Sequence, residues 1–186
     1  LAGDEIVREC QGRFDTPGLR FVHVNDLKRP EQAAAYDAVF CMEVFEHVVD
    51  PAPLLADFER LLVPGGSLVV SVPIETGVAV VIKQAGRRVA GWRGIGDYPG
   101  TTGYTPGELV RSVFAGSQPH IDRPVFRRAD GSAFHDHKGF NWRVLRAALA
   151  VRFDILRTLT SPVSWLGPQL ATQVWFVARR RALPGN

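Results

Sequence analysis

The stretch that decides the fold is YDAVFCMEVFEHVVDPAPLLADFERLLVPGGSLVVSVP, residues 36–73. It opens with Tyr36 to Met42, a nearly continuous apolar run that is typical of a strand buried on both faces of a sheet. Asp50-Pro51 then forms an N-cap and first-turn pair, and apolar residues repeat at helical spacing until Pro64-Gly65-Gly66. A second buried strand, Ser67 to Val72, follows at once. The order strand, helix, strand predicts a layered α/β sheet.

Further elements are predicted on both sides of this stretch. They are a helix over residues 3–14, a strand over Leu19 to Val24, a helix over Asn141 to Ala150, and strands over Arg152 to Leu159 and Gln173 to Ala178. The connection from Ser161 to Gln169 contains two prolines and a glycine and suits a hairpin. We therefore expect the last two strands to be antiparallel.

The composition is that of an ordinary globular chain. Its 186 residues are 46% hydrophobic and 22% charged, which predicts one domain over residues 1–186 whose core needs no disulfide. Two isolated cysteines, Cys10 and Cys41, favour reduced thiols and a cytoplasmic location. Apolar runs such as Val78 to Ile82 are far shorter than the roughly 20 residues of a membrane span. A net charge of +3 is too small to argue for a nucleic-acid partner.

Residues 74–134 differ from the rest of the chain, because glycines and prolines interrupt most of the helix and strand patterns there. A helix over Val78 to Val89 is the one regular element expected there. We expect this segment to be an insertion or lid between the predicted strand over Ser67 to Val72 and the predicted helix over Asn141 to Ala150. Its basic side chains are interleaved with Trp92, Tyr98 and Tyr104, so an anionic or nucleic-acid substrate is conceivable, although an ordinary solvated substrate lid is favoured.

The residues from Tyr36 to Pro73 resemble the central segment of the class I S-adenosylmethionine-dependent methyltransferases of type 11/12. The resemblance rests on a strand that runs into "EVFEHV", a helix, the sequence "LVPGG" and the next strand, all in the family's order. It implies a Rossmann-like sheet with helices on both faces and S-adenosylmethionine as the cofactor. It further implies methyl transfer to an oxygen, nitrogen or carbon of a small-molecule acceptor. The sequence leaves open which acceptor this is and what the oligomeric state of the protein is.

The sequence departs from the family at its start. The family places a glycine-rich loop after its first strand and an acid after its second, and neither precedes Leu19 here. Gly94-Ile95-Gly96 follows no predicted strand and is a poor substitute. We expect an N-terminally incomplete copy of the domain that lacks roughly 30 residues or more, the size of a strand-helix-strand unit. The alternative is a degenerate relative that no longer binds the cofactor.

The resemblance assigns cofactor contacts to two groups of residues. Asp26 would accept a hydrogen bond from the adenine amino group, with Asn25 and Leu27 flanking the ring; the alternative is a turn residue that caps the strand end. The backbone of Cys41, Met42 and Glu43 would line the methionine side of the pocket.

Glu43, Glu46 and His47 form an ExxEH pattern, which on one helical turn would point three potential metal ligands the same way. The pattern is similar to the metal-binding motif of small-RNA 2′-O-methyltransferases and ubiquinone-pathway O-methyltransferases. His137 is the expected fourth ligand, with His135 as the second choice. The alternative is a site without metal, in which the Glu and His position the substrate and His47 or His137 acts as general base.

Three functions therefore compete. The first is an S-adenosylmethionine-dependent methyltransferase that acts on a small molecule. The second is a metal-dependent O-methyltransferase of the small-RNA or quinone type. The third is a non-catalytic methyltransferase-like binding module. A nicotinamide-dependent oxidoreductase would have a similar layered α/β sheet, but its glycine fingerprint is not found in the sequence.

Overall fold

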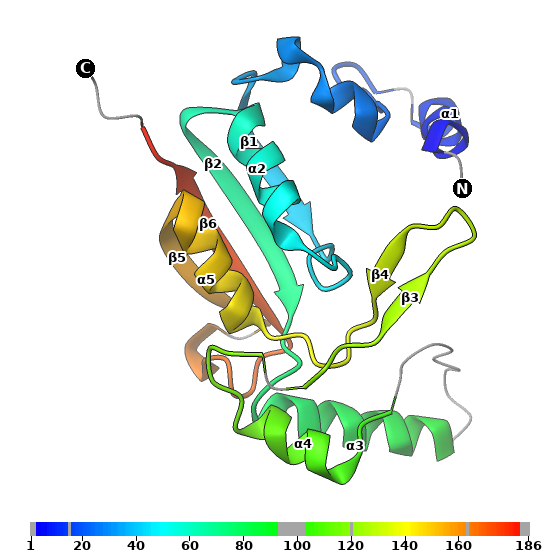
Figure 1. Ribbon diagram of the computed structural model, residues 1–186, viewed down its shortest axis with the longest axis vertical. Coiled ribbons are helices and arrows are strands. Elements are labelled where there is room, and N and C mark those ends of the chain that lie inside the picture. Colours follow the sequence, from blue (N-terminus) through cyan, green and yellow to red (C-terminus); the bar gives the residue numbers. More distant parts are fainter. Residues whose placement is uncertain (1–2, 15, 93–102, 120, 163, 183–186) are drawn as a thin grey trace.

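The computed structural model describes residues 3–14, 16–92, 103–119, 121–162 and 164–182 (Figure 1). Its helices are α1 (Gly3–Arg13), α2 (Pro51–Leu61), α3 (Val78–Trp92), α4 (Pro106–Val113) and α5 (Trp142–Arg152), with short 3-10 turns η1 (Val24–Lys28), η2 (Pro30–Gln32) and η3 (Ser164–Leu166). Its strands are β1 (Tyr36–Met42), β2 (Leu62–Pro73), β3 (Val125–Arg127), β4 (Ala133–His135), β5 (Phe153–Ser161) and β6 (Gln173–Arg180). The predicted α/β class is confirmed.

The main sheet has four strands in the order β1-β2-β6-β5. β1 runs parallel to β2, whereas β6 is antiparallel to both of its neighbours. The last two strands are therefore antiparallel, as predicted from the short connection between them. Because β6 returns between β2 and β5, the centre of the sheet is formed by two apolar strands, which pair from Ser67 to Pro73 on β2 and from Gln173 to Arg179 on β6.

The core lies between this sheet and the pair of helices α2 and α5, which cover one of its faces (Figure 1). Side chains that alternate along the two central strands are fully buried there, namely Leu68, Val70, Val72, Val174, Phe176 and Ala178. The Asp50 carboxylate caps α2 by accepting a hydrogen bond from the Ala52 N–H at 3.0 Å. α2 ends at Leu61, a little before the prolyl-glycyl-glycine sequence, because β2 already begins at Leu62.

The opposite face of the sheet is more open. Phe40 on β1 is 66% exposed, and Met42 and Leu159 on the same face are also exposed. Helices were expected on both faces, but among the described residues only α2 and α5 cover a face, while α3 and α4 cross the carboxyl end of β2 (Figure 1). In the described part of the chain, β1 pairs with β2 alone, so its other edge carries no strand.

The strand predicted for Leu19 to Val24 is not formed. Residues 19–23 have no regular secondary structure, and Val24 is already the first residue of η1. The Arg60 side chain at the end of α2 donates hydrogen bonds to the carbonyl oxygens of Leu27 and Arg29 and so holds η1 at that end of the helix. A β-strand needs a neighbouring edge for its hydrogen bonds, and no described strand lies beside this segment. The strand prediction is therefore wrong for these residues.

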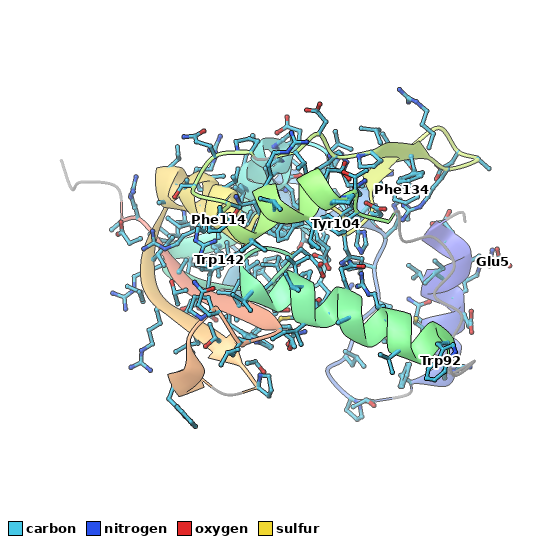
Figure 2. The ribbon with its side chains drawn as sticks, turned by 90° about the horizontal axis from the view of Figure 1, so that it is seen from below. Glu5, Trp92, Tyr104, Phe114, Phe134 and Trp142 are labelled. Atoms are coloured by element: carbon cyan, nitrogen blue, oxygen red, sulfur yellow. The ribbon has the colours of Figure 1, made fainter. Side chains whose placement is uncertain are left out.

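The segment between β2 and α5 supplies two helices and a small hairpin. α3 and α4 lie side by side across the end of the main sheet (Figure 2), and β3 pairs with β4 as an antiparallel two-stranded sheet. The helix expected over Val78 to Val89 is present and continues to Trp92. Gly94, Gly96 and Tyr98 lie outside the described residues. No helix in the described ranges is long and apolar enough to cross a membrane.

Candidate active site

The residues after β1 form a turn that brings polar side chains to the carboxyl end of the sheet. Glu43 has φ +54°, in the left-handed region, and the His47 N–H donates to the Val44 carbonyl oxygen at 2.9 Å. The expected helical turn over residues 43–47 is therefore wrong. The Glu43 carboxylate does not point with its neighbours but accepts a hydrogen bond from the Ser71 hydroxyl on β2 at 2.9 Å.

Glu46, His47 and His137 form a compact cluster. One carboxylate oxygen and one ring nitrogen from each imidazole all lie within 4.8 Å of one another. The two histidine rings are nearly perpendicular, with centroids 4.8 Å apart, and the His47 Nε2 is 3.9 Å from a Glu46 oxygen. Of the four predicted ligands the structure gathers three, and Glu43 lies outside the cluster.

His135 holds His47 in place through a pair of hydrogen bonds. Its N–H donates to the His47 carbonyl oxygen at 3.0 Å, and the His47 Nδ1 donates to the His135 carbonyl oxygen at 2.9 Å. The His135 Nδ1 in turn donates to the Pro124 carbonyl oxygen at 2.7 Å. Because a carbonyl oxygen can only accept, the Nδ1 of His47 carries the hydrogen and its Nε2 keeps a free lone pair. His135, the second choice for a ligand, therefore orients His47.

Burial dominates the electrostatics of the cluster. The Glu46 side chain is 0% exposed, and neither of its carboxylate oxygens has a hydrogen-bond partner among the described residues. Desolvation by burial raises the pKa of Glu46 to about 7, with the nearby Glu43 charge acting in the same direction. Burial and the neighbouring His47 lower the pKa of His137. The cluster therefore holds a carboxylate and two imidazole nitrogens whose bonding capacity the described protein does not use.

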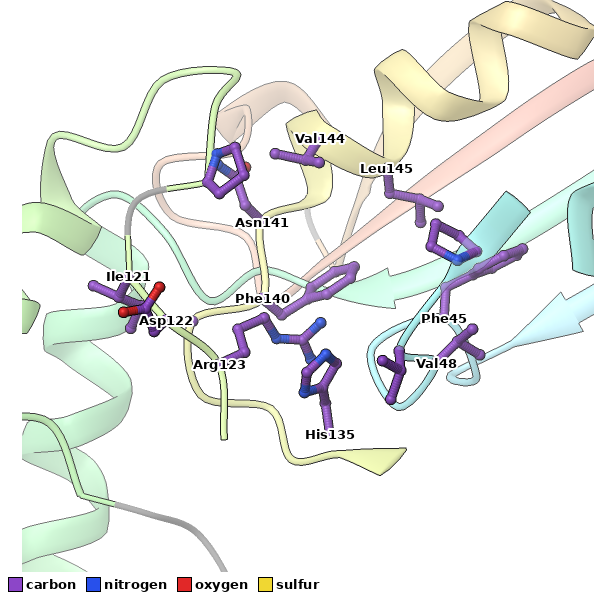
Figure 3. A pocket seen from close by; sticks show the side chains of 14 residues that line it. Phe45, Val48, Ile121, Asp122, Arg123, His135, Phe140, Asn141, Val144 and Leu145 are labelled. Atoms are coloured by element: carbon purple, nitrogen blue, oxygen red, sulfur yellow. The ribbon is translucent and has the colours of Figure 1, made fainter. Parts of the chain in front are cut away.

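Two hollows flank the turn that carries Glu46. A cavity of about 350 Å³ has mostly apolar walls and is shown in Figure 3. It is lined by Phe45, Val48, Val49, Pro51, Pro119, Ile121, Asp122, Arg123, His135, Gly139, Phe140, Asn141, Val144 and Leu145. A second hollow of about 420 Å³ lies between the turn and the β3–β4 hairpin and includes Glu43, His47 and Arg128. Either hollow is large enough to receive a small molecule next to the turn.

The residues expected to contact the cofactor fall into two separate groups. Asp26 and Leu27 share a hollow with Tyr36, the first residue of β1, and the Asp26 carboxylate pairs with Arg29 at 2.6 Å. Met42 and Glu43 lie at the opposite end of β1, which spans roughly 20 Å. Asn25 belongs to the same 3-10 turn as Asp26. The structure does not bring the two groups together.

Cys41, the third predicted residue at the carboxyl end of β1, is a buried free thiol. Desolvation by burial raises its pKa to about 12, so the thiol stays protonated. Its side chain packs in the core beside the turn, and only its backbone is available to line a pocket.

Sequence reasoning missed one residue at the site. The Arg123 guanidinium donates hydrogen bonds to the carbonyl oxygens of Glu46, Asp136 and Lys138. It stands in an irregular Asp-Arg-Pro sequence before β3, without periodicity or motif to mark it. Its contacts join segments that are far apart in the chain, and local patterns do not reveal such contacts.

Part of the chain is similar in sequence to known methyltransferases. Residues 3–70 match the family model described as a methyltransferase domain. A ubiquinone biosynthesis O-methyltransferase from Xanthomonas oryzae pv. oryzae is 42% identical over 67 residues, which are 36% of this chain and 28% of that protein. The protein of the same name from Xylella fastidiosa is 45% identical over 56 residues, 30% of this chain and 23% of that one. The chain thus matches only about a quarter of the length of these relatives.

Solved structures extend the likeness to nearly the whole chain. A SAM-dependent methyltransferase from Methanosarcina mazei superposes with a TM-score of 0.52 at 16% identity, covering 97% of this chain and 79% of that one. An S-adenosylmethionine-dependent methyltransferase from Mesorhizobium loti gives 0.50 at 13% identity, covering 95% and 77%. At such identities the likeness concerns the fold. The chain thus has the fold of class I S-adenosylmethionine-dependent methyltransferases, and its residues 3–70 match the methyltransferase domain model.

Proposed function

We propose that this protein transfers a methyl group from S-adenosylmethionine to an oxygen atom of a small-molecule acceptor. The observation that carries the proposal is the buried Glu46 carboxylate, which lacks hydrogen-bond partners among the described residues and lies beside His47 and His137. Burying such a group costs folding free energy, so its place beside two imidazoles favours a functional role. The names of the relatives, ubiquinone biosynthesis O-methyltransferases, support oxygen as the acceptor atom.

S-adenosylmethionine would supply the methyl group at the carboxyl end of β1, where ligands of such sheets bind. The backbone of Cys41, Met42 and Glu43 is available there, beside the open edge of the strand. No glycine-rich loop lies at this edge among the described residues. Cys41, Met42 and Glu43 would therefore form only one wall of a cofactor pocket. Contact of Asn25, Asp26 and Leu27 with the adenine ring stays a prediction, and it requires η1 to lie at the other end of β1.

Glu46, His47 and His137 would hold a divalent cation, and Glu43 is the proposed fourth ligand. Carboxylate oxygens and imidazole nitrogens suit first-row transition metals, and the unused carboxylate of Glu46 fits this role. A bound cation would lower the pKa of an acceptor hydroxyl. The protein's own part is to fix the His47 tautomer through the His135 carbonyl and to keep Glu46 away from water. Glu43 would have to leave the Ser71 hydroxyl to join the set.

The same residues also support methyl transfer without a metal. The lowered pKa of His137 keeps its ring neutral near pH 7, so it can accept a proton from an acceptor hydroxyl. His47, with its free Nε2, is the alternative base. Most of the barrier in a methyl transfer falls through proximity and orientation, so few reactive side chains are needed.

The acceptor would enter through one of the hollows beside the turn. Residues 74–134, which we propose to be an insertion or lid, contribute walls to both hollows. Hollows of a few hundred Å³ favour a small molecule over a nucleic acid, although Arg128 at one rim leaves an anionic acceptor open. The cytoplasmic location expected from two unpaired cysteines also stays a prediction.

The test is a pair of calorimetric titrations on chelator-treated protein, one with Co²⁺ and one with S-adenosylmethionine. We expect both to bind, and we expect Glu46→Gln to weaken Co²⁺ binding at least tenfold while the exposed Glu31→Gln does not. Binding of S-adenosylmethionine without Co²⁺ would support the metal-free site. Binding of neither ligand, with a native circular dichroism spectrum, would overturn the enzyme and leave the non-catalytic binding module.

A further inference from the structure

Arg123 lies at the centre of the candidate site without being one of its predicted residues. Its guanidinium donates to the carbonyl oxygen of Glu46, to that of Asp136 at 2.9 Å and to that of Lys138 at 3.3 Å. The guanidinium also lies over the Phe140 ring, 5.3 Å from its centroid. Figure 3 shows the side chain between Phe140 and His135.

The three acceptors have a simple relation to the cluster. Glu46 is itself a cluster residue, and Asp136 and Lys138 are the immediate neighbours of His137 on both sides. One planar cation therefore connects the backbone of the turn after β1 to the backbone that presents His137. The contacts therefore join the backbone of one cluster residue, Glu46, to the backbone on both sides of another, His137.

The position of Arg123 is costly and specific. Desolvation by burial lowers its pKa to about 10, which still leaves it charged at neutral pH. The nearby negative charges of Asp136 and Glu46 favour the charged form, while the direct contacts of the guanidinium are to backbone carbonyl oxygens and the Phe140 ring. Because the hydrogen bonds of this partly buried guanidinium to the described residues go to backbone carbonyl oxygens, its geometry favours a role in placing those carbonyls.

Gly139 gives independent support. It has φ +73°, and a Cβ at this position would lie 2.6 Å from the Ile121 Cγ1 and 3.1 Å from the Arg123 Cγ. The backbone after His137 thus passes directly against the stem of Arg123, and only glycine allows both this approach and this backbone angle.

We propose that Arg123 is a positioning residue that holds His137 at ligand distance from Glu46 and His47. The inference rests on the proposed divalent cation site and adds the residue that sets its geometry. Lysine at this position keeps the charge, but a single ammonium group cannot reproduce the flat fork that reaches three carbonyls. The segment carrying His137 would then drift, and the cluster would lose one imidazole ligand while Glu46 and His47 remain.

The test compares Arg123→Lys with Arg181→Lys in the whole chain. Arg181 is the control because its guanidinium also donates to two backbone carbonyls, of Val151 and Ala150, at 2.9 and 2.8 Å, in addition to an ion pair with Asp154 at 3.0 Å. We expect Arg123→Lys to weaken Co²⁺ binding by about tenfold or more and to change the visible absorption band of bound Co²⁺. Arg181→Lys should change neither, whatever it does to the unfolding temperature.

The outcomes separate the inference from the function on which it rests. If the wild-type protein binds Co²⁺ and Arg123→Lys binds it with the same affinity and spectrum, Arg123 is not a positioning residue and the metal site stands. If the wild type binds no Co²⁺, both ideas fail. If Arg123→Lys does not fold, Gly139→Ala replaces it, since the added methyl group would press on the Ile121 side chain and on the stem of Arg123; an unchanged Co²⁺ spectrum there would equally overturn the inference.

Discussion

Residues 3–32 and residues 36–70 lie in the same stretch of similarity to the methyltransferase domain, yet they differ in how they fold. The second region forms β1, α2 and most of β2, and it contributes fully buried side chains such as Leu68 and Val70. The first region forms one helix and short turns, and its apolar Ile6 and Phe14 are about half exposed. A strand or helix pattern therefore yields packed structure only where a partner surface is present to receive it.

The largest effect should come from the core of the second region. Leu68→Ala removes a fully buried side chain packed between the sheet and α2, and we expect a loss of about 3 kcal/mol in the free energy of unfolding. Urea denaturation followed by circular dichroism measures it. A loss below about 1 kcal/mol would show that this region packs no better than the first one.

The next effect is a pH dependence that only the second region should carry. The folded pKa of Glu46 is raised from 4.5 to about 7, so the folded state holds the proton more tightly than the unfolded chain. Stability is therefore fully present below about pH 4.5 and falls by up to about 3 kcal/mol as the pH rises through 7.

Glu46→Gln should flatten this dependence, measured as unfolding free energy between pH 5 and pH 8 in the presence of a chelator. The exposed Glu31→Gln serves as its control and should keep the wild-type slope. Equal slopes in wild type and Glu46→Gln would mean that Glu46 is solvated in solution.

A smaller effect concerns the start of α2. Asp50→Ala removes the acceptor of the Ala52 N–H, and we expect a loss of about 1 kcal/mol. Asp50→Asn keeps an acceptor oxygen and should lose clearly less. Thermal denaturation of the two variants side by side checks the order, and an equal loss in both would point to the charge rather than the hydrogen bond.

The smallest effect should come from the first region. Ile6 on α1 is 46% exposed, so Ile6→Ala should change the unfolding free energy by less than about 0.5 kcal/mol. The substitution matches Leu68→Ala in kind, and the same denaturation assay compares them. A loss near that of Leu68→Ala would mean that α1 docks on an apolar surface and that the contrast between the two regions is wrong.

Much of the second region was predictable because its signals are local and agree with one another. The strand over Tyr36 to Met42 has the predicted bounds, and the Asp50 cap is present. The antiparallel pairing of β5 with β6 followed from a short connection. In each case the pattern of one segment, or of two neighbours in sequence, contains the information.

The rest was not predictable because it depends on contacts between distant segments. Leu19 to Val24 has a strand pattern, but whether an edge lies beside it is a property of the whole fold. Of the predicted group of Glu43, Glu46, His47 and His137, the last three lie close together. The left-handed backbone that turns the Glu43 side chain toward Ser71 has no sequence signal in a non-glycine residue.

The two cysteines allow the two regions to be followed separately by chemistry. Cys41 is buried in β1 with a pKa of about 12, so almost none of it is the reactive thiolate near neutral pH. Cys10 is half-buried on α1, in the region of residues 3–32 whose apolar side chains are partly exposed. An alkylating reagent would thus modify Cys10 in the native protein and reach Cys41 only when the sheet opens. The rate at which Cys41 is alkylated therefore measures how often the core opens.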